Sequence, residues 1–169
     1  IITPRSQINK NYNNEDFYSL SSGELEPLVL RPETTMGSYS YARYILSGYH
    51  DPKFRLPICV WQHGKSFRRE QDQPAKFMRL KEFYQLEFQI LFASSTANDY
   101  YPVVVEAVKK ALSELLNHMV EQTMHVCYKV ASDRLPDYSE ETTDIVFGRD
   151  ILDCMEICSI SRRKDYDEK

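Results

Sequence analysis

Residues 64–92 decide the fold of this chain, and their sequence is GKSFRREQDQPAKFMRLKEFYQLEFQILF. The stretch predicts a strand, a polar loop and a second strand, which together form a hairpin. Side chains alternate between the faces of a strand, so this hairpin projects basic and acidic groups from one face of a sheet. Arginine suits phosphate, because its planar guanidinium donates hydrogen bonds in pairs and stays charged. Carboxylates beside the arginines can orient an amino group, so the hairpin predicts an anionic nucleotide and a cationic amine as its ligands.

The hairpin strongly resembles motif 2 of the class II aminoacyl-tRNA synthetases. The F-R-x-E core of that motif corresponds to residues 67–70, FRRE, and the R-x-x-E-F after its loop corresponds to residues 79–83. Within the class, the glycyl branch is the most similar. Its LRPET segment matches residues 30–34, and its W-x-E-I…R-x-x-Y-D stretch resembles residues 155–167 around MEI, Arg163 and Tyr166-Asp167. A single F-R-x-E match would be common by chance, whereas this ordered set is specific.

The resemblance implies an α+β fold in which a class II synthetase-like antiparallel sheet is flanked by helices, with the active site on one sheet face. Residues 2–4, ITP, look like the end of motif 1, a strand that closes on proline. The motif 1 helix would precede that strand, and motif 3 would follow Lys169. We therefore expect residues 1–169 to form one catalytic core that lacks the motif 1 helix and motif 3.

The resemblance also assigns an ATP site with magnesium. Arg68 is the implied catalytic residue, because it would contact the α-phosphate, where negative charge develops during adenylate formation. Phe83 would stack on adenine, and Glu156 would hold magnesium, which needs few carboxylates when phosphate oxygens complete its shell. The implied ATP-binding residues are Arg68, Arg69, Glu70, Arg79, Leu80, Phe83, Glu156 and Ile157.

The same resemblance implies that the amino acid is glycine. Glu33 and Glu87 match positions that hold its ammonium group, and Arg31 belongs to the same amino-acid-binding set. The chain also departs from the glycyl pattern near this pocket. The family usually has Ala-Gln at Thr35-Met36, Asn at Arg69, small residues near Ser159 and Ser161, and an Asp near Arg162.

Composition narrows the range of partners. With a net charge of −4 the chain is not a globally basic nucleic-acid binder, so tRNA would have to meet a local patch. No apolar run approaches the length of a membrane helix, and no signal peptide is visible at the start. The four cysteines and four histidines show no zinc spacing. We expect a cytoplasmic protein that does not bind membranes and that forms a homodimer, as class II cores do.

Hydrophobic periodicity predicts the other elements. Residues 28–30 and 56–62 indicate strands, and residues 36–46 indicate a helix. The apolar spacing over residues 102–132 predicts one long helix, which places His118 and His125 on the same element. Residues 137–150 look like an acidic loop with a short strand at 145–147, and residues 151–160 indicate a further strand.

The predicted function is ATP-dependent activation of glycine as an aminoacyl adenylate for transfer to tRNA. One alternative is a non-catalytic synthetase-like homologue that binds nucleic acid or serves a polymerase as an accessory protein. Such homologues lose the motif 2 arginine and glutamates, which this chain keeps. Another alternative is a synthetase-like ligase that adenylates a different small acid.

Overall fold

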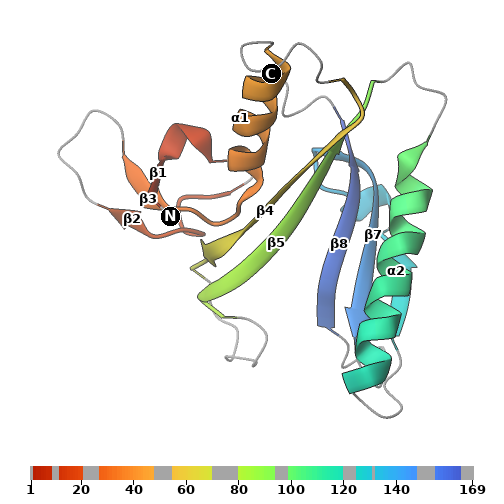
Figure 1. The fold of residues 1–169 in the computed structure, drawn as a ribbon. Helices are drawn as coiled ribbons and strands as arrows, with labels where there is room; N and C mark the ends of the chain where they lie inside the picture. The colour runs from red at the N-terminus through yellow and green to blue at the C-terminus, as the bar shows by residue number, and fades with distance from the viewer. Residues whose placement is uncertain are drawn as a thin grey trace. The chain divides into compact units, whose positions relative to one another are not determined.

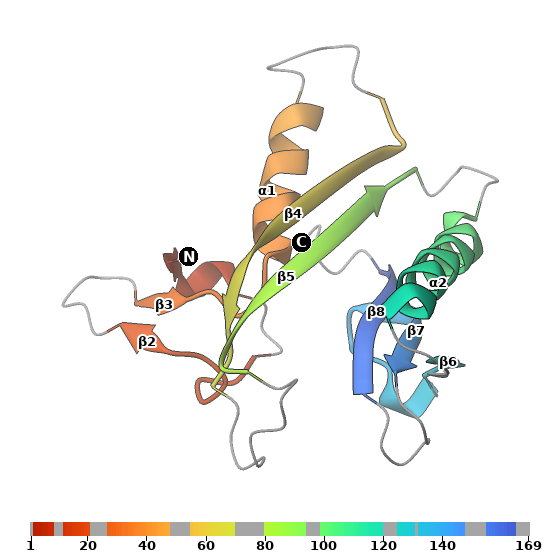
Figure 2. The same cartoon turned by 60° about the horizontal axis from the view of Figure 1, so that its bottom comes forward.

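The computed structural model divides the chain into two compact units, Ile1–Ser95 and Thr96–Lys169. Each unit packs a helix against antiparallel strands (Figures 1 and 2), which confirms the predicted α+β class. The prediction of a single core over residues 1–169 stays a prediction. The structure describes residues 2–8, 12–20, 27–47, 55–69, 80–93, 99–119, 125–130, 132–147 and 155–164.

A small antiparallel sheet opens the first unit, in the order β1-β3-β2. The central strand β3 bonds to both neighbours, and its Val29 is fully buried against Ile8 and Phe17. A single turn of 3-10 helix, Arg5–Gln7, follows β1. The strands are β1 (Ile2–Pro4), β2 (Ser19–Leu20) and β3 (Leu28–Leu30).

The predicted hairpin is confirmed as a two-stranded antiparallel ribbon of β4 (Ile58–Phe67) and β5 (Glu82–Leu91). The loop between residues 70 and 79 lies outside the described residues. Residues directly opposite one another share a face, so Gln62 and Glu87 lie on one face of the ribbon. The other face is open to solvent, and its large side chains include Trp61, Tyr84, Leu86 and Phe88.

Helix α1 (Thr35–Leu46) packs on the first face of the ribbon, as Figure 1 shows. Its buried residues Ala42 and Ile45 contact Val60, because positions three and seven residues apart return to one side of a helix. Gly37 permits the close approach at the other end of α1. A β-carbon built there would lie 2.7 Å from Oε1 of Gln62.

The second unit covers an antiparallel sheet, in the order β6-β7-β8, with helix α2 (Tyr100–Met119). The carboxylate of Asp99 accepts a hydrogen bond from the backbone N–H of Tyr101 and caps the helix. Among the described residues, no helix has both the length and the apolar character needed to cross a membrane. The strands are β6 (His125–Lys129), β7 (Ser139–Phe147) and β8 (Met155–Arg163), and the 3-10 turn Ser132–Arg134 joins β6 to β7.

Two sequence predictions in this unit are wrong. The helix predicted over residues 102–132 ends at Met119, and His125 lies on β6 instead of on a helix with His118. Val126 fits both a helical and a strand pattern, and its sheet partner Val146 selects the strand. Residues 139–147 form strand β7, which includes the short strand predicted at 145–147 but extends over residues 139–144, where a loop was predicted. Their serine and threonine side chains look loop-like in sequence, but they are buried and hydrogen-bonded, and β-branched threonine favours strands.

Candidate active site

The guanidinium of Arg68 is the centre of the candidate site. Arg68 directly follows β4, and its backbone N–H donates to the carbonyl of Lys81 at 3.0 Å, which extends the ladder past the strand end. Its Nε donates to the carbonyl of buried Pro32 at 3.1 Å. The ring centroids of Phe83 and Tyr12 lie 5.4 and 5.9 Å from its Cζ. These contacts hold the side chain in one place.

None of the residues that the structure describes neutralises the charge of Arg68. In the described part of the chain, no carboxylate pairs with its guanidinium and no group accepts a hydrogen bond from its Nη atoms. Aromatic rings stabilise a guanidinium without cancelling its charge. A fixed cation with two Nη groups available suits a bidentate oxyanion such as phosphate.

Arg31 ties the end of β3 to the ribbon. Its Nε donates to the carbonyl of Lys65 at 2.9 Å, and its own carbonyl accepts from the N–H of Phe67 at 2.9 Å. The guanidinium lies over Gly64, where any β-carbon would collide with it. Glycine is therefore required at this position for Arg31 to cross the ribbon face.

Two half-buried carboxylates, Glu33 and Glu87, each accept a hydroxyl hydrogen bond. Tyr12 donates to Oε2 of Glu33 at 3.2 Å, and Thr35 donates to Oε2 of Glu87 at 3.0 Å. A carboxylate offers about four acceptor positions on its two oxygens, so Glu87 retains capacity for an ammonium ligand.

The groups follow one another along one face of the ribbon. Glu87 lies opposite Gln62, the next pair on that face has Gly64 beneath Arg31, and the following pair includes Phe83. A strand rises about 3.4 Å per residue, so Glu87 and Phe83 are about 14 Å apart along β5. The order along the face is carboxylate, guanidinium, aromatic ring and then Arg68.

Buried polar atoms without a partner occur where α1 meets this face. Among the described residues, Oγ1 of Thr34, Oγ of Ser38 and Oε1 of Gln62 have no hydrogen-bond partner, and the same holds for Nε of Arg162 in the second unit. A buried polar atom without a partner costs about 1–3 kcal/mol. The first turns of α1 therefore give up stability at the place where the site residues gather.

The remaining hairpin residues are only partly placed. Arg69 is exposed, and its backbone N–H donates to the carbonyl of Asp16 at 2.9 Å. Leu80 is exposed just before β5. Glu70 and Arg79, both predicted to bind ATP, lie outside the described residues.

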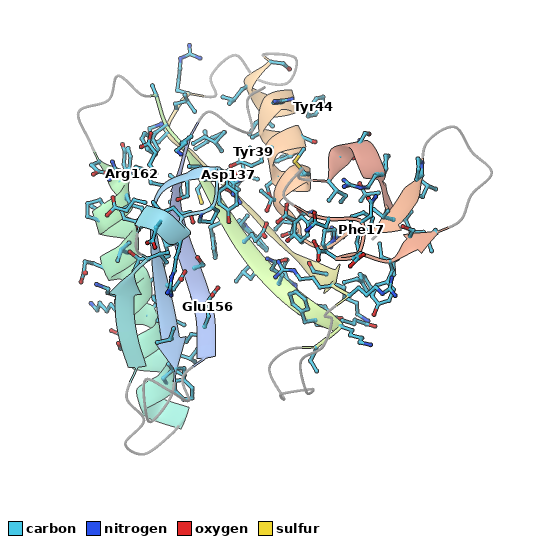
Figure 3. The ribbon with its side chains drawn as sticks, turned by 180° about the vertical axis from the view of Figure 1, so that it is seen from behind. Phe17, Tyr39, Tyr44, Asp137, Glu156 and Arg162 are labelled. Carbon is cyan, nitrogen blue, oxygen red and sulfur yellow. The ribbon has the colours of Figure 1, made fainter. Side chains whose placement is uncertain are left out.

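Glu156 and Ile157 belong to the second unit. Both lie on β8, and Figure 3 labels Glu156. Glu156 is exposed and pairs in register with Val146. No group of three or more potential metal ligands occurs among the described residues. The exposed carboxylate of Glu156 fits a single ligand to a magnesium ion that arrives with nucleotide phosphates.

The departures from the glycyl pattern in the second unit make internal contacts. Ser161 shares a hydrogen bond with Thr142 at 2.9 Å across the sheet. The Nη2 of Arg162 lies 2.5 Å from the carboxylate of Asp99 and 3.5 Å from that of Glu141. Arg162 therefore ties the start of α2 to the sheet.

The opposite face of the ribbon carries an ion pair. Lys65 donates to Glu82, its neighbour in the ribbon, and the ring of Tyr84 lies 5.7 Å from its Nζ. The hydrogen bond and the charge of Glu82, with a smaller contribution from Tyr84, raise the pKa of Lys65 above the usual lysine value of 10.5.

Sequence reasoning missed the contributions of Tyr12, Gln62 and Ser38. Of these three residues, only Ser38 had a local signal in the sequence. Thr34, Thr35 and Ser38 precede Ala42 on one side of α1, so a polar start to an otherwise apolar stripe was visible in the sequence. Tyr12 reaches the site through contacts that join distant parts of the chain, and no periodicity reports these.

The sequence pattern of the tRNA synthetase class II core domain (G, H, P, S and T) matches residues 18–168. The chain belongs to this family. The glycine–tRNA ligase of Mycoplasma capricolum is 28% identical to it over 142 residues, which cover 84% of this chain and 30% of that protein. The glycine–tRNA ligase of Mycoplasmopsis synoviae is 29% identical over 144 residues, covering 85% and 31%. The chain thus spans about a third of the length of these curated relatives.

Solved structures confirm the class II fold. The cytoplasmic serine–tRNA ligase of Naegleria fowleri, in complex with AMP, superposes with a TM-score of 0.66 at 18% identity, covering 98% of this chain and 39% of that one. The prolyl-tRNA synthetase of Cryptosporidium parvum, complexed with halofuginone and AMPPNP, gives a TM-score of 0.66 at 19% identity, covering 94% and 32%. At this level of identity the likeness concerns the fold alone.

Proposed function

We propose that this chain activates an amino acid with ATP as an aminoacyl adenylate for transfer to tRNA, and that the amino acid is glycine. The observation that carries this proposal is the guanidinium of Arg68. It is anchored by Pro32 and two rings, and it keeps its charge without a carboxylate partner among the described residues. Membership of the synthetase family supports the reaction, and the glycine–tRNA ligases among its relatives support the substrate.

In this proposal Arg68 receives the α-phosphate of ATP. Negative charge builds up on that phosphate as the bond to pyrophosphate breaks, and a fixed cation stabilises it without reorganising. Adenine stacks on the ring of Phe83. Magnesium, held by Glu156 and the phosphates, would neutralise the leaving pyrophosphate. By the family resemblance Arg69, Glu70, Arg79, Leu80 and Ile157 complete the ATP site.

The amino acid binds at the other end of the ribbon face. Glu33 and Glu87 accept from its ammonium group, and Arg31 faces its carboxylate. One carboxylate oxygen attacks the α-phosphorus while pyrophosphate leaves with the electron pair of the broken P–O bond. The attacking group is already ionised at neutral pH, so no general base is needed and catalysis depends on positioning and charge.

The order of groups on the ribbon supports this assignment. An aminoacyl adenylate has an ammonium at one end, an acyl phosphate in the middle and adenine at the other end. Glu87, Arg31 and Phe83 present a carboxylate, a cation and an aromatic ring in that sequence over about 14 Å. An extended ligand can therefore meet each group in turn.

The proposal includes a cytoplasmic location, a homodimer and tRNA as the acceptor. The homodimer is tested by light scattering at tens of micromolar, where a mass of twice 19.9 kDa is expected. A mass of 19.9 kDa would reject the dimer for this chain. The acceptor is tested by charging of total tRNA with labelled glycine.

The test of the reaction is amino-acid-dependent exchange of pyrophosphate into ATP by the full chain. Glycine should stimulate exchange most, and Arg68→Ala should reduce the rate about a hundredfold, as expected for loss of one charge-stabilising group. Arg43→Ala, which removes an exposed arginine of α1, is the matched control and should keep the wild-type rate.

Each other outcome of this assay selects a different function. Exchange stimulated best by serine, threonine or alanine would reject glycine and leave an adenylating enzyme. ATP binding without exchange for any standard amino acid would favour the non-catalytic homologue. Wild-type exchange by Arg68→Ala would reject Arg68 as the catalytic residue.

A further inference from the structure

Thr35 connects the start of α1 to the centre of β5. Its side chain is 5% exposed, and its Oγ1 donates to Oε2 of Glu87 at 3.0 Å across 52 positions of sequence. Position 35 is also one where the chain departs from the glycyl pattern. The hydroxyl that reaches Glu87 is therefore a feature of this chain.

The surroundings restrict Glu87 on the helix side. Gln62 lies directly opposite it in the ribbon, and a β-carbon built at Gly37 would lie 2.7 Å from Oε1 of Gln62, so the Gln62 amide packs closely against α1. A carboxylate beside the first turn of a helix is also favoured by the partial positive charge of the helix N-terminus. Packing and charge thus both act on the side chain that Thr35 holds.

We propose that Thr35 is a positioning residue that fixes one carboxylate oxygen of Glu87, so that the remaining acceptor positions meet the substrate ammonium. This inference rests on the proposed function. A glutamate side chain with three rotatable bonds loses freedom when it binds a ligand, and a carboxylate that is already held loses less. The hydrogen bond is charge-assisted, which makes it stronger than one between neutral groups.

A neighbouring contact separates positioning from simple tethering of the helix. One turn along α1, the hydroxyl of Tyr39 donates to Oε1 of Gln89 at 3.3 Å (Figure 3 labels Tyr39). This bond also joins α1 to β5, but it ends on a neutral amide. If Thr35 only tethers the helix, removing the hydroxyl of Thr35 or that of Tyr39 should change the KM for glycine equally.

The experiment compares Thr35→Val, Thr35→Ser and Tyr39→Phe in the pyrophosphate exchange assay with glycine. Thr35→Val keeps the β-branched shape and removes the hydroxyl. It should raise the KM for glycine about tenfold, the loss of one charge-assisted hydrogen bond. The KM for ATP and kcat should stay within twofold. Thr35→Ser restores the hydroxyl and should return the KM for glycine to near the wild-type value, and Tyr39→Phe should match wild type.

A double substitution gives a second readout. In a Glu87→Gln background the charge that Thr35 holds is absent, so adding Thr35→Val should raise the KM for glycine less than twofold further. Should Thr35→Val fail to fold, as judged by circular dichroism, Thr35→Ala takes its place in both comparisons.

The inference and the proposed function fail in different ways. An unchanged KM for glycine in Thr35→Val, with an active wild type, overturns the role of Thr35 and leaves the proposed function standing. An equal rise in Tyr39→Phe shows that tethering of the helix explains the effect, and also overturns it. Absence of exchange by the wild type with every amino acid overturns the proposed function and this inference together.

Discussion

Arg68 in the first unit and Arg162 in the second show two uses of the same side chain. Arg162 lies against the carboxylates of Asp99 and Glu141, so its charge is neutralised within the fold. Arg68 lies between aromatic rings and a backbone carbonyl, and no carboxylate in the described part of the chain pairs with it. Arg162 therefore finds its counter-charge within the fold. Under the proposed function, the counter-charge of Arg68 comes from the bound phosphate.

The polar groups beneath the helices of the two units also differ in whether they find hydrogen-bond partners. In the second unit Tyr101 of α2 bonds to Thr143 of β7 at 2.8 Å, and Ile145 and Val146 are fully buried. In the first unit the N-terminal turns of α1 bury hydroxyls and an amide oxygen that lack partners among the described residues, whereas in the second unit such an atom, Nε of Arg162, lies on β8. Stability is given up where the ligand groups gather, as is common at functional sites.

The largest expected effect is on the core of the second unit. Ile145 is 0% exposed, so Ile145→Ala should lower the free energy of unfolding by about 2–5 kcal/mol through lost burial and the cavity left behind. Leu115→Ala, at an exposed position of α2, is the control, and its free energy of unfolding should change by no more than about 0.5 kcal/mol. Urea denaturation followed by circular dichroism measures both. A loss of unfolding free energy below about 1 kcal/mol for Ile145→Ala, where about 2–5 kcal/mol is expected, would contradict the burial of this side chain.

The two arginines should respond in opposite ways to removal. Arg68→Ala should weaken ATP affinity at least tenfold, which is about 1.4 kcal/mol, with little change in stability. Arg162→Ala should lower the free energy of unfolding by about 1 kcal/mol, because its ion pairs are partly exposed, and should keep ATP affinity. Calorimetry with magnesium–ATP and denaturant titration measure the pair. The comparison fails if both variants lose ATP affinity equally.

Two buried serines of the first unit should change stability in opposite directions. Ser38→Ala removes a hydroxyl without a partner from a helix, so the free energy of unfolding should rise by up to about 1 kcal/mol. Ser66→Ala removes a hydroxyl that donates to Gln85 at 2.8 Å, and should lower it by about 1 kcal/mol. A loss in Ser38→Ala as large as in Ser66→Ala would show that the Ser38 hydroxyl is satisfied.

The smallest expected effect concerns Lys65 on the open face of the ribbon. Its pKa is raised in the folded chain, so its pairing with Glu82 stabilises the fold fully below 10.5, the usual lysine value. That contribution is lost as pH rises through the higher folded pKa. Thermal unfolding of wild type and Lys65→Met should differ slightly at pH 8 and converge at the alkaline end. A difference in unfolding temperature between the two proteins that grows as pH rises would contradict a raised pKa of Lys65.

The sequence by itself determined the elements whose signal is local. Alternation and helical spacing predicted β3, α1 and the β4–β5 hairpin, and residues 67–70 with 79–83 indicated the synthetase family that the comparison confirms. These succeed because side-chain periodicity and short motifs lie within a few residues of one another. The same local rules could not separate helix from strand at residues 125–129, where both periods fit.

Only the tertiary structure decided which side chains meet. The hydroxyl of Thr35 reaches Glu87 across 52 positions, and that of Tyr12 reaches Glu33 across 21. The strand at residues 139–147 forms because its polar side chains find partners on neighbouring strands. Contacts of this kind depend on the pairing of distant segments, which a local pattern does not encode. The physical reason is that a hydroxyl or carboxylate is stable when buried only if the rest of the fold supplies its partner.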